Sequence, residues 1–434
     1  MRCLVTGAYG FIGQYVVRAL IEAGWDVVGA GRDIDTGRRL LPDIDWISCD
    51  FNEDTDAVIW APRLEGVDAV VNCVGILQST ARDDADQIQN RATVALFTAA
   101  AAAKVKRLVH ISAISAEEGV DTAYARSRLA AERALDDLDL NWVIVKPSLV
   151  IGPGSYGGTS LMRGLAGLPG LLPIPGDGSV RFQPIAMDDL AKGITALLTA
   201  MRPARATLYA AGPEPVSVAD ILKEYRRWLG FSKAREIRVP PILLKPLLLC
   251  GDLAGWLGHA SALRSTALAQ MKYDTLHDPK PFSRATGLKL SALPAVLAAR
   301  PATLQDRLHA RSFFLLPALH ITIALFWIIT GIVTLLDPGH ETIRRITARI
   351  GLAPEVSDVF VMAAACADIV LGALFLLPGW VRRAGSAQIA LSLAYLAAIG
   401  WLAGELWLDP LGPALKVVPL IVATLLVMAC AEKR

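Results

Sequence analysis

The sequence has few cysteines and no pattern that would pair them or bind a metal. Its 434 residues include six cysteines, with no CxxC motif and no histidine pair nearby. Scattered cysteines of this kind are typical of small buried hydrophobic residues in a reducing compartment. We therefore expect neither a disulfide framework nor a metal site. The six are Cys3, Cys49, Cys73, Cys250, Cys366 and Cys430.

The sequence also lacks clustered basic charge, and no leader segment is expected. Its formal net charge is +2, and no basic stretch offers the surface that binding to a phosphate backbone requires, so no nucleic-acid partner is expected. The first motif begins near residue 5, which leaves no space for a cleavable signal peptide. We expect the first domain to lie in the cytoplasm.

Apolar residues are abundant. Hydrophobic residues make up 53% of the chain, and its mean hydropathy of +0.43 is too high for an ordinary soluble enzyme of this length. The length predicts two or three domains, and the composition places part of the chain in lipid.

The first thirteen residues, MRCLVTGAYGFIG, have the pattern of a strand followed by a glycine-rich turn. Gly7, Gly10 and Gly13 follow the apolar run at intervals of three, and residues 14–23 then keep apolar side chains on one helical face. Glycines at this spacing permit a tight turn, a close approach of phosphate to the backbone, and close packing of helix on strand. The segment predicts a dinucleotide site at the N-terminus of the first helix.

A short apolar strand with a polar or glycine residue at its end occurs four times in succession. This rhythm predicts a Rossmann-type doubly wound parallel sheet of the α/β class. Arg32 ends the second strand and suits the additional phosphate of NADP, so NADP(H) is favoured over NAD(H), although an exposed loop arginine is the alternative. Asp50 and Gly75 follow the third and fourth strands, where adenine and the cofactor backbone would lie.

Several motifs occur in the order typical of one superfamily. The runs TGAYGFIG, VVNCVGIL, HISA and YARSR resemble the short-chain dehydrogenase/reductase superfamily in its extended and atypical branches. VVNCVGIL, with RFQPI at 181–185 and the following Asp188 and Asp189, resembles the branch related to the nucleotide-binding accessory subunit of respiratory complex I. The resemblance covers residues 1–300 and implies that Ser112 positions a substrate carbonyl, that Tyr124 transfers a proton, and that Asn90 assists.

The resemblance also implies a lysine four residues after the tyrosine, and this sequence has Arg128 there. Positions i and i+4 share a helix face, so Arg128 would bring a cation beside the phenol of Tyr124. The planar guanidinium is a poor geometric substitute for an ammonium that holds two ribose hydroxyls. A hydride-transfer enzyme, a protein that holds NADP without turnover, and an ordinary surface helix at Tyr124 all remain open.

The predicted nucleotide-binding residues are of three kinds: some lie in the glycine turn, some lie at strand ends, and some have a role that the resemblance implies. They are Thr6, Gly7, Tyr9, Gly10, Phe11, Ile12, Gly13, Arg32, Asp50, Phe51, Cys73, Val74, Gly75, Tyr124, Arg128 and Pro147.

Three domains are expected: 1–150 binding the nucleotide, 151–305 covering the substrate, and 306–434 in the membrane. In the second domain Arg163 and Arg181 are candidates to clamp an anionic group, although a surface salt bridge is the favoured reading of each. The apolar segment 241–257 either rests on a membrane surface or forms a buried helix.

Four apolar segments near 313–336, 356–377, 387–404 and 411–430 have the length that crosses a bilayer as a helix. Basic residues border them at 307 and 311, 382 and 383, and 433 and 434, which places both termini and the first domain on the cytoplasmic side of an inner membrane. The basic loop at 344–349 is expected to form an interfacial helix. Asp368 lies near the middle of the second segment, where a carboxylate serves as a functional site or fixes helix register by pairing with His320 or Lys416. The four segments resemble the DoxX-like membrane family.

These observations predict a membrane-anchored NAD(P)H-binding oxidoreductase acting on an apolar, lipid-like or quinone-like substrate. One alternative is a non-catalytic NADPH-holding subunit of a membrane assembly, with a membrane-protein partner. A second alternative is an epimerase or reductase of a soluble anionic substrate.

Overall fold

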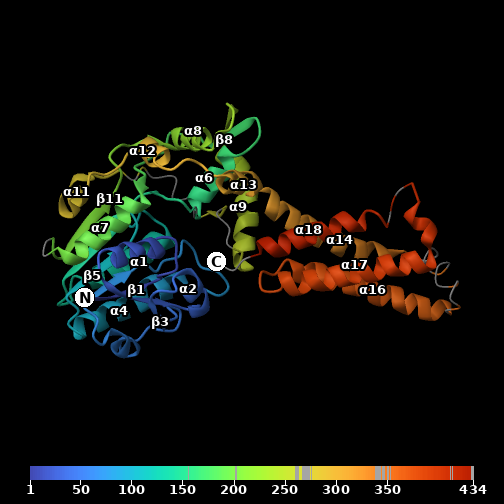
Figure 1. Cartoon of the computed structure of the whole chain (residues 1–434), viewed down its shortest axis with the longest axis horizontal. Helices are drawn as coiled ribbons and strands as arrows, with labels where there is room; N and C mark the ends of the chain where they lie inside the picture. Colours follow the sequence, from blue (N-terminus) through green and yellow to red (C-terminus); the bar gives the residue numbers. More distant parts are fainter. Residues whose placement is uncertain are drawn as a thin grey trace. The chain divides into compact units, whose positions relative to one another are not determined.

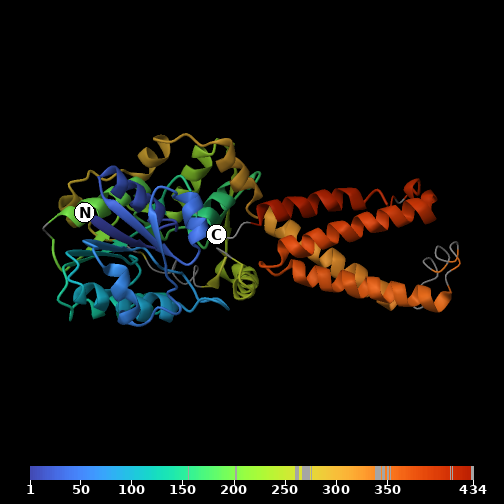
Figure 2. The same cartoon turned by 60° about the horizontal axis from the view of Figure 1, so that its bottom comes forward.

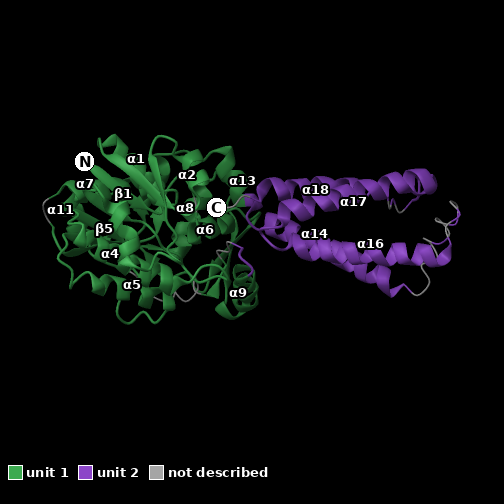
Figure 3. Ribbon diagram, turned by 90° about the horizontal axis from the view of Figure 1, so that it is seen from below, with its two compact units in different colours: residues 1–256, 260–310 green, residues 257–259, 311–434 purple. Residues whose placement is uncertain are grey.

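The computed structural model divides the chain into two compact units (Figure 3). Unit 1 comprises residues 1–256 and 260–310, and unit 2 comprises residues 257–259 and 311–434. The structure describes the chain except residues 155, 201–202, 260–262, 266–273, 275, 338–343, 345–347, 349–350, 352, 411, 413 and 432–434. The expectation of an interfacial helix at 344–349, and the basic residues 433 and 434, therefore fall mainly or wholly outside the described residues.

Unit 1 is built on a seven-stranded parallel sheet of order β11-β6-β5-β4-β1-β2-β3 (Figure 1). The predicted doubly wound fold is confirmed. The strands are β1 (Arg2–Thr6), β2 (Asp26–Gly31), β3 (Asp45–Ser48), β4 (Ala69–Asn72), β5 (Arg107–Ile111), β6 (Trp142–Pro147) and β11 (Ala206–Ala210). The strand order reverses between β1 and β4, and the open end of such a reversal is where doubly wound sheets bind ligands.

Helices cover both faces of this sheet, which is why the central strands are apolar throughout (Figure 2). One face packs against α1 (Gly13–Glu22), α7 (Met187–Thr199) and α11 (Lys280–Thr286). The other packs against α3 (Ala57–Trp60), the 3₁₀ helix η1 (Ala61–Leu64), α4 (Ala92–Ala102) and α5 (Ala123–Ala134). The helix α2 (Ile34–Leu40) follows β2, and the π-helical segment η2 (Gln87–Arg91) precedes α4.

A smaller lobe with its own apolar core completes unit 1. Its strands pair as β7 (Val150–Ile151) with β10 (Ile185–Ala186), β9 (Arg181–Phe182) with β12 (Val216–Ser217), and β8 (Leu171–Pro175) with β13 (Arg235–Val239). Its helices are α6 (Gly158–Ala166), α8 (Val218–Trp228), α9 (Pro241–Trp256), α12 (Leu293–Ala298) and α13 (Leu304–Ser312), the last of which ends just beyond the unit.

Unit 2 consists of apolar helices. They are α14 (Leu315–Leu336), α16 (Pro354–Phe375), α17 (Val381–Leu402), the 3₁₀ helix η3 (Gly404–Trp407) and α18 (Val417–Cys430). By length and composition, α14, α16 and α17 can each cross a membrane, whereas α18 is a shorter apolar helix. Its 14 residues span about 21 Å, less than the roughly 30 Å of a hydrocarbon core.

The predicted fourth span at 411–430 therefore begins several residues before the helix α18 does. Gly412 adopts φ +58°, and the chain from Ala414 to Lys416 forms a turn, so regular helix begins only at Val417. The third helix begins earlier than predicted, at Val381, because Arg382 and Arg383 are helical although they interrupt the apolar run.

Asp368 is buried in unit 2 and accepts a hydrogen bond from Tyr395 at 3.2 Å. His320, proposed above as its partner, instead contacts the carbonyl of Phe375 at 2.6 Å. The acid is thus paired across α16 and α17, and Tyr395 was not among the candidates.

Glycines bring α14 and α16 into close contact. A Cβ atom added at Gly331 would lie 2.5 Å from the carbonyl oxygen of Ala365, and one at Gly372 would lie 2.7 Å from that of Ala324. Small residues at a helix crossing let the two backbones approach, as is common between membrane helices.

We predict that Gly331→Ala destabilises unit 2 by about 1–3 kcal/mol, because the added methyl group forces the two helices apart. Thermal unfolding of the full chain in detergent measures the effect. Gly404→Ala is the matched control, since no atom lies within 4 Å of the position of its added Cβ. Equal melting temperatures for the two variants would contradict the packing role of Gly331.

Candidate functional site

The glycine turn between β1 and α1 is held by contacts within its own backbone. Gly7 adopts φ +66°, its amide donates to the carbonyl of Ala30 at 3.0 Å, and its carbonyl accepts from the amide of Gly10 at 2.9 Å. A Cβ atom at Gly13 would collide with that carbonyl of Gly7. The turn therefore requires glycine at both ends, for steric reasons internal to the chain.

This turn leaves main-chain donors at the start of α1. Among the described residues, the amides of Phe11 and Ile12 donate to no backbone carbonyl. Free amides at a helix N-terminus bind pyrophosphate, so the residues present fit a dinucleotide. The ring of Phe11 stacks on Tyr156 at a centroid distance of 6.0 Å, which connects the turn to the loop after β7.

A series of buried polar contacts connects the ends of β1, β4 and β5. Thr6 donates to the side-chain oxygen of Asn72 at 2.7 Å, and the same oxygen accepts from the amide of Val74 at 3.1 Å. The side-chain nitrogen of Asn72 lies 3.3 Å from Nδ1 of His110. Burial, reinforced by the charges of Arg128 and Lys146, lowers the pKa of His110 well below its usual value, so its ring is neutral.

The residues at the end of β4 face the glycine turn. The backbone of Cys73 lies against Gly7, where an added Cβ atom would come within 3.2 Å of the Cys73 carbonyl. Burial raises the pKa of the Cys73 thiol to about 12, so it remains protonated. Gly75 lies against the guanidinium of Arg128, which occupies the space where a Cβ atom would be.

Arg128 is buried between these strand ends and the ring of Tyr124. Its Nη1 donates to the carbonyl of Ile111 at 2.7 Å, and its guanidinium carbon lies 5.1 Å from the centre of the Tyr124 ring. Its Nε has no hydrogen-bond partner among the described residues. The structure thus brings Tyr124, Arg128 and Gly75 together at the carboxyl edge of β4 and β5.

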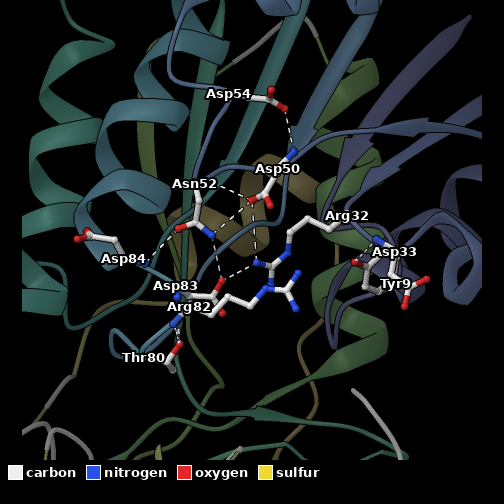
Figure 4. A network of polar contacts seen from close by, with 10 residues as sticks. All are labelled: Tyr9, Arg32, Asp33, Asp50, Asn52, Asp54, Thr80, Arg82, Asp83 and Asp84. Carbon is white, nitrogen blue, oxygen red and sulfur yellow. Dashed lines mark hydrogen bonds and ion pairs between the residues drawn. The ribbon is translucent and has the colours of Figure 1, made fainter. Parts of the chain in front are cut away.

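Arg32 lies in a network of acidic groups (Figure 4). Its guanidinium is 2.5 Å from Asp83 and 4.0 Å from Asp50, and Asn52 donates to Asp83 at 3.1 Å. Burial acts to raise the pKa of Asp83, but the hydrogen bonds from Arg32 and Asn52 outweigh it and lower the pKa. Asp83 is therefore the ion-pair partner of Arg32, the residue that the sequence analysis assigned to a nucleotide phosphate.

Tyr9 contacts the end of β2, whereas Phe51 packs into the core beside Trp60. The hydroxyl of Tyr9 accepts from the amide of Asp33 at 3.2 Å, and its ring covers Gly31. The ring of Phe51 is buried against Trp60, at a centroid distance of 5.2 Å. A nucleotide contact by Phe51 is therefore restricted to its main chain and remains a prediction.

Two residues predicted to serve catalysis are hydrogen-bonded elsewhere. The hydroxyl of Ser112 donates to the carboxylate of Glu132. The side-chain amide of Asn90 donates to Asp86 at 3.0 Å, one turn earlier. The roles assigned to Ser112 and Asn90 stay predictions, and each would require these contacts to change.

Sequence reasoning missed a buried ion pair beside Ser112. Glu132 lies 2.8 Å from Nζ of Lys146, which also donates to the carbonyl of Ala116 at 2.5 Å. Lys146 directly precedes the predicted cofactor residue Pro147, at the end of β6. The signal was present in the spacing: Tyr124, Arg128 and Glu132 recur every four residues and share one face of α5.

Aromatic residues at the end of β11 extend this cluster. The ring of Tyr209 stacks on His277 at 3.8 Å, and His277 lies 3.1 Å from Glu117. Burial and the hydrogen bond with Glu117 raise the pKa of Tyr209 to about 12, so this phenol stays protonated. Gln89 on η2 is also buried, and its Oε1 has no hydrogen-bond partner among the described residues.

The two arginines considered for an anionic substrate are both in ion pairs. Arg163 is buried and lies 3.3 Å from Asp306, while Arg181 donates to Asp274 at 2.9 Å. The favoured reading as a surface salt bridge agrees with the exposed pair of Arg181, whereas the ion pair of Arg163 is buried.

We predict that Glu132→Leu destabilises unit 1 by about 3–5 kcal/mol, because it leaves Lys146 as a buried unpaired cation. The double variant Glu132→Leu/Lys146→Met removes both charges and should recover most of the loss. Thermal or denaturant unfolding in detergent measures both variants. The ion pair is not the stabilising element if the single variant unfolds like the wild type, or if the double variant is as unstable as the single one.

Two family models match the chain. Residues 3–212 match the NAD dependent epimerase/dehydratase family, and residues 324–425 match the DoxX-like family. The first match covers the strands, the glycine turn and the Tyr124 region, and the second covers most of unit 2.

Curated relatives include two reductases. A 3-diazoavenalumate denitrifying reductase of Streptomyces is 29% identical over 286 residues, which is 59% of this chain and 88% of that protein. A ceramide reductase of Caulobacter vibrioides is 27% identical over 197 residues, 44% of this chain and 59% of that protein. Subunit 9 of the NADH dehydrogenase 1 alpha subcomplex of Dictyostelium discoideum is 26% identical over 34% of this chain and 42% of its own length.

Solved structures share the fold. A dTDP-glucose 4,6-dehydratase of Bacillus anthracis in complex with NAD has a TM-score of 0.53 at 15% identity, covering 69% of this chain and 94% of that one. A dTDP-glucose 4,6-dehydratase double mutant of Streptomyces venezuelae with NAD bound has a TM-score of 0.50 at 21% identity, covering 72% and 95%. The chain thus combines an N-terminal domain that matches the NAD dependent epimerase/dehydratase family and is similar to the short-chain dehydrogenases/reductases with a C-terminal domain that matches the DoxX-like family.

Proposed function

We propose that the protein is a membrane-anchored, NADPH-dependent reductase of an apolar carbonyl compound. The observation that supports this most is the placement of Tyr124 and Arg128 at the strand ends that face the glycine turn. On this proposal unit 1 lies in the cytoplasm and unit 2 holds it at the inner membrane, which is supported by three helices that are long and apolar enough to cross a bilayer. An apolar, lipid-like or quinone-like substrate fits this tethering, because such a compound resides in the bilayer.

In this mechanism the chain binds the nucleotide and supplies a proton. The amides of Phe11 and Ile12 would hold the pyrophosphate, and Arg128, whose guanidinium lies over the ring of Tyr124, would support the ribose. The nucleotide, when bound, would supply the hydride for the carbonyl carbon. Tyr124 gives its phenolic proton to the carbonyl oxygen, so the products are the alcohol and NADP⁺, and water restores the proton to Tyr124.

A non-catalytic NADPH-holding subunit is the second candidate. Arg128 in place of lysine and the hydrogen bond of Ser112 to Glu132 favour it, because both remove parts of the catalytic set that the superfamily implies. A respiratory complex subunit is among the relatives, which also supports a holder. A holder of this kind would have a membrane protein as its partner. An epimerase or reductase of a soluble anionic substrate is less well supported, since Arg163 and Arg181 are both paired.

We predict that Tyr124→Phe lowers the turnover number by about 10²–10⁴-fold while the affinity for NADPH stays unchanged, because the ring remains and only the proton is lost. The measurement is NADPH oxidation by the full chain with apolar ketones or quinones in nanodiscs, together with nucleotide binding by fluorescence. An unchanged rate in the variant would contradict the role of Tyr124 as proton donor, and no turnover with any such compound despite tight NADPH binding would favour the holder.

We predict that Arg32→Ala weakens NADPH binding about tenfold or more and changes NADH binding little. A charge-assisted hydrogen bond contributes roughly 1.5–3 kcal/mol, and about 1.4 kcal/mol is a factor of ten. Asp83→Asn should have the opposite effect on NADPH, since it removes the carboxylate that competes for Arg32. Equal losses for both nucleotides in Arg32→Ala would refute the preference for NADPH.

A further inference from the structure

The helix α9 presents an apolar surface to the surroundings of unit 1. Its exposed large side chains, each 47–67% accessible, are Ile242, Leu243, Leu247, Leu249, Leu253 and Trp256. Four of them, at positions 242, 249, 253 and 256, follow helical spacing and form one stripe. Soluble surfaces rarely expose a contiguous apolar patch of this kind, which marks an interaction site.

The opposite side of α9 is packed against unit 1. Leu248, Gly251 and Gly255 are its buried residues, and they share one face at intervals of three and four. Arg264 lies against Gly255, where an added Cβ atom would come within 2.6 Å of its guanidinium carbon. The helix therefore has one anchored side and one apolar side, and the segment predicted to be either surface-bound or buried is largely exposed.

The chain passes from α9 into residues 257–259, which belong to unit 2. Trp256 is followed within three residues by His259, whose ring lies 2.7 Å from the carbonyl oxygen of Leu376 in unit 2. Leu376 is the C-cap of α16, and it precedes Arg382 and Arg383 at the start of α17.

Basic residues precede the helix. Lys233, Arg235 and Arg238 are exposed on β13 and its approach, and Lys245 is exposed on α9 itself. An apolar stripe beside cationic groups is typical of helices that lie in the interface of a bilayer containing anionic lipids.

The polar edge of α9 is bonded to the loop that follows β4. Asp252 accepts from the side chain of Gln78 at 3.4 Å, and Arg264, 3.6 Å from Asp252, donates to the carbonyl of Ser79 at 3.1 Å. Ser79 also lines a surface hollow of about 300 Å³, together with Ala123 and Ser127 on either side of Tyr124 in the sequence.

We propose that α9 is a second membrane contact, which lies in the headgroup layer with its apolar stripe among the acyl chains and directs bilayer-borne substrate toward the hollow lined by Ser79, Ala123 and Ser127. This inference rests on the proposed membrane anchoring of the chain. Its occupant is the lipid bilayer, and a second copy of the chain is the competing occupant.

The test uses the full wild-type chain in nanodiscs that contain anionic phospholipid and a lipid with a photoreactive diazirine on its acyl chain. After illumination, mass spectrometry locates the adducts. We expect adducts on α14, α16, α17 and on residues 242–256, and none on α3, where Val58 is 74% exposed and apolar. Adducts on the spanning helices without any on α9 would overturn this proposal alone, whereas their absence throughout would overturn the anchoring as well.

The native thiol of Cys250, exposed on α9, gives an independent readout. We expect a membrane-impermeant maleimide to modify Cys250 at least tenfold more slowly than the engineered thiol of Val58→Cys, in discs that hold one chain. Equal rates in single-chain discs, with protection appearing only when discs hold two chains, would assign the stripe to a second copy and refute the lipid contact.

Discussion

The contact between Gly13 and the carbonyl of Gly7 is the constraint on which the nucleotide site depends. Because no side chain fits there, the backbone turns sharply out of β1 and begins α1 with free amides at its first turn. The hydrogen bonds from Thr6 and Val74 to Asn72 then fix the ends of β1 and β4 on either side of that turn. The conformation of the turn is thus set by backbone sterics and a few buried polar groups.

Buried charge organises the neighbouring chemistry. Arg128 is held by a carbonyl of β5 and by contact with Gly75, and Glu132 pairs with Lys146 on β6, the third strand from β1 in the sheet. These groups lie on one face of α5, so a single helix positions the phenol, the guanidinium and the carboxylate. The guanidinium and the carboxylate are buried and bonded, which suits both proposed roles: proton transfer to a bound substrate, and permanent retention of a nucleotide.

The sequence was sufficient for the sheet, because apolar strands ending in glycine or polar residues repeat at regular intervals in the first half of the chain. The sequence was less informative about which residues each side chain bonds to. The hydrogen bond from Ser112 to Glu132 joins residues twenty positions apart, and the ion pair of Arg32 with Asp83 joins residues fifty-one apart, so neither follows from local periodicity. The short helix α18 was overestimated because hydropathy does not detect the turn at Gly412.

The most direct test of the central claim is the binding of nicotinamide nucleotides to the purified full chain, with Gly13→Ala compared with Gly158→Ala. A Cβ atom at Gly158 has no atom within 4 Å, whereas one at Gly13 meets the carbonyl of Gly7. The account predicts that the wild type and Gly158→Ala bind NADPH alike and that Gly13→Ala binds it at least tenfold more weakly. Failure of the wild type to bind either pyridine nucleotide, or unaltered binding by Gly13→Ala, would contradict it.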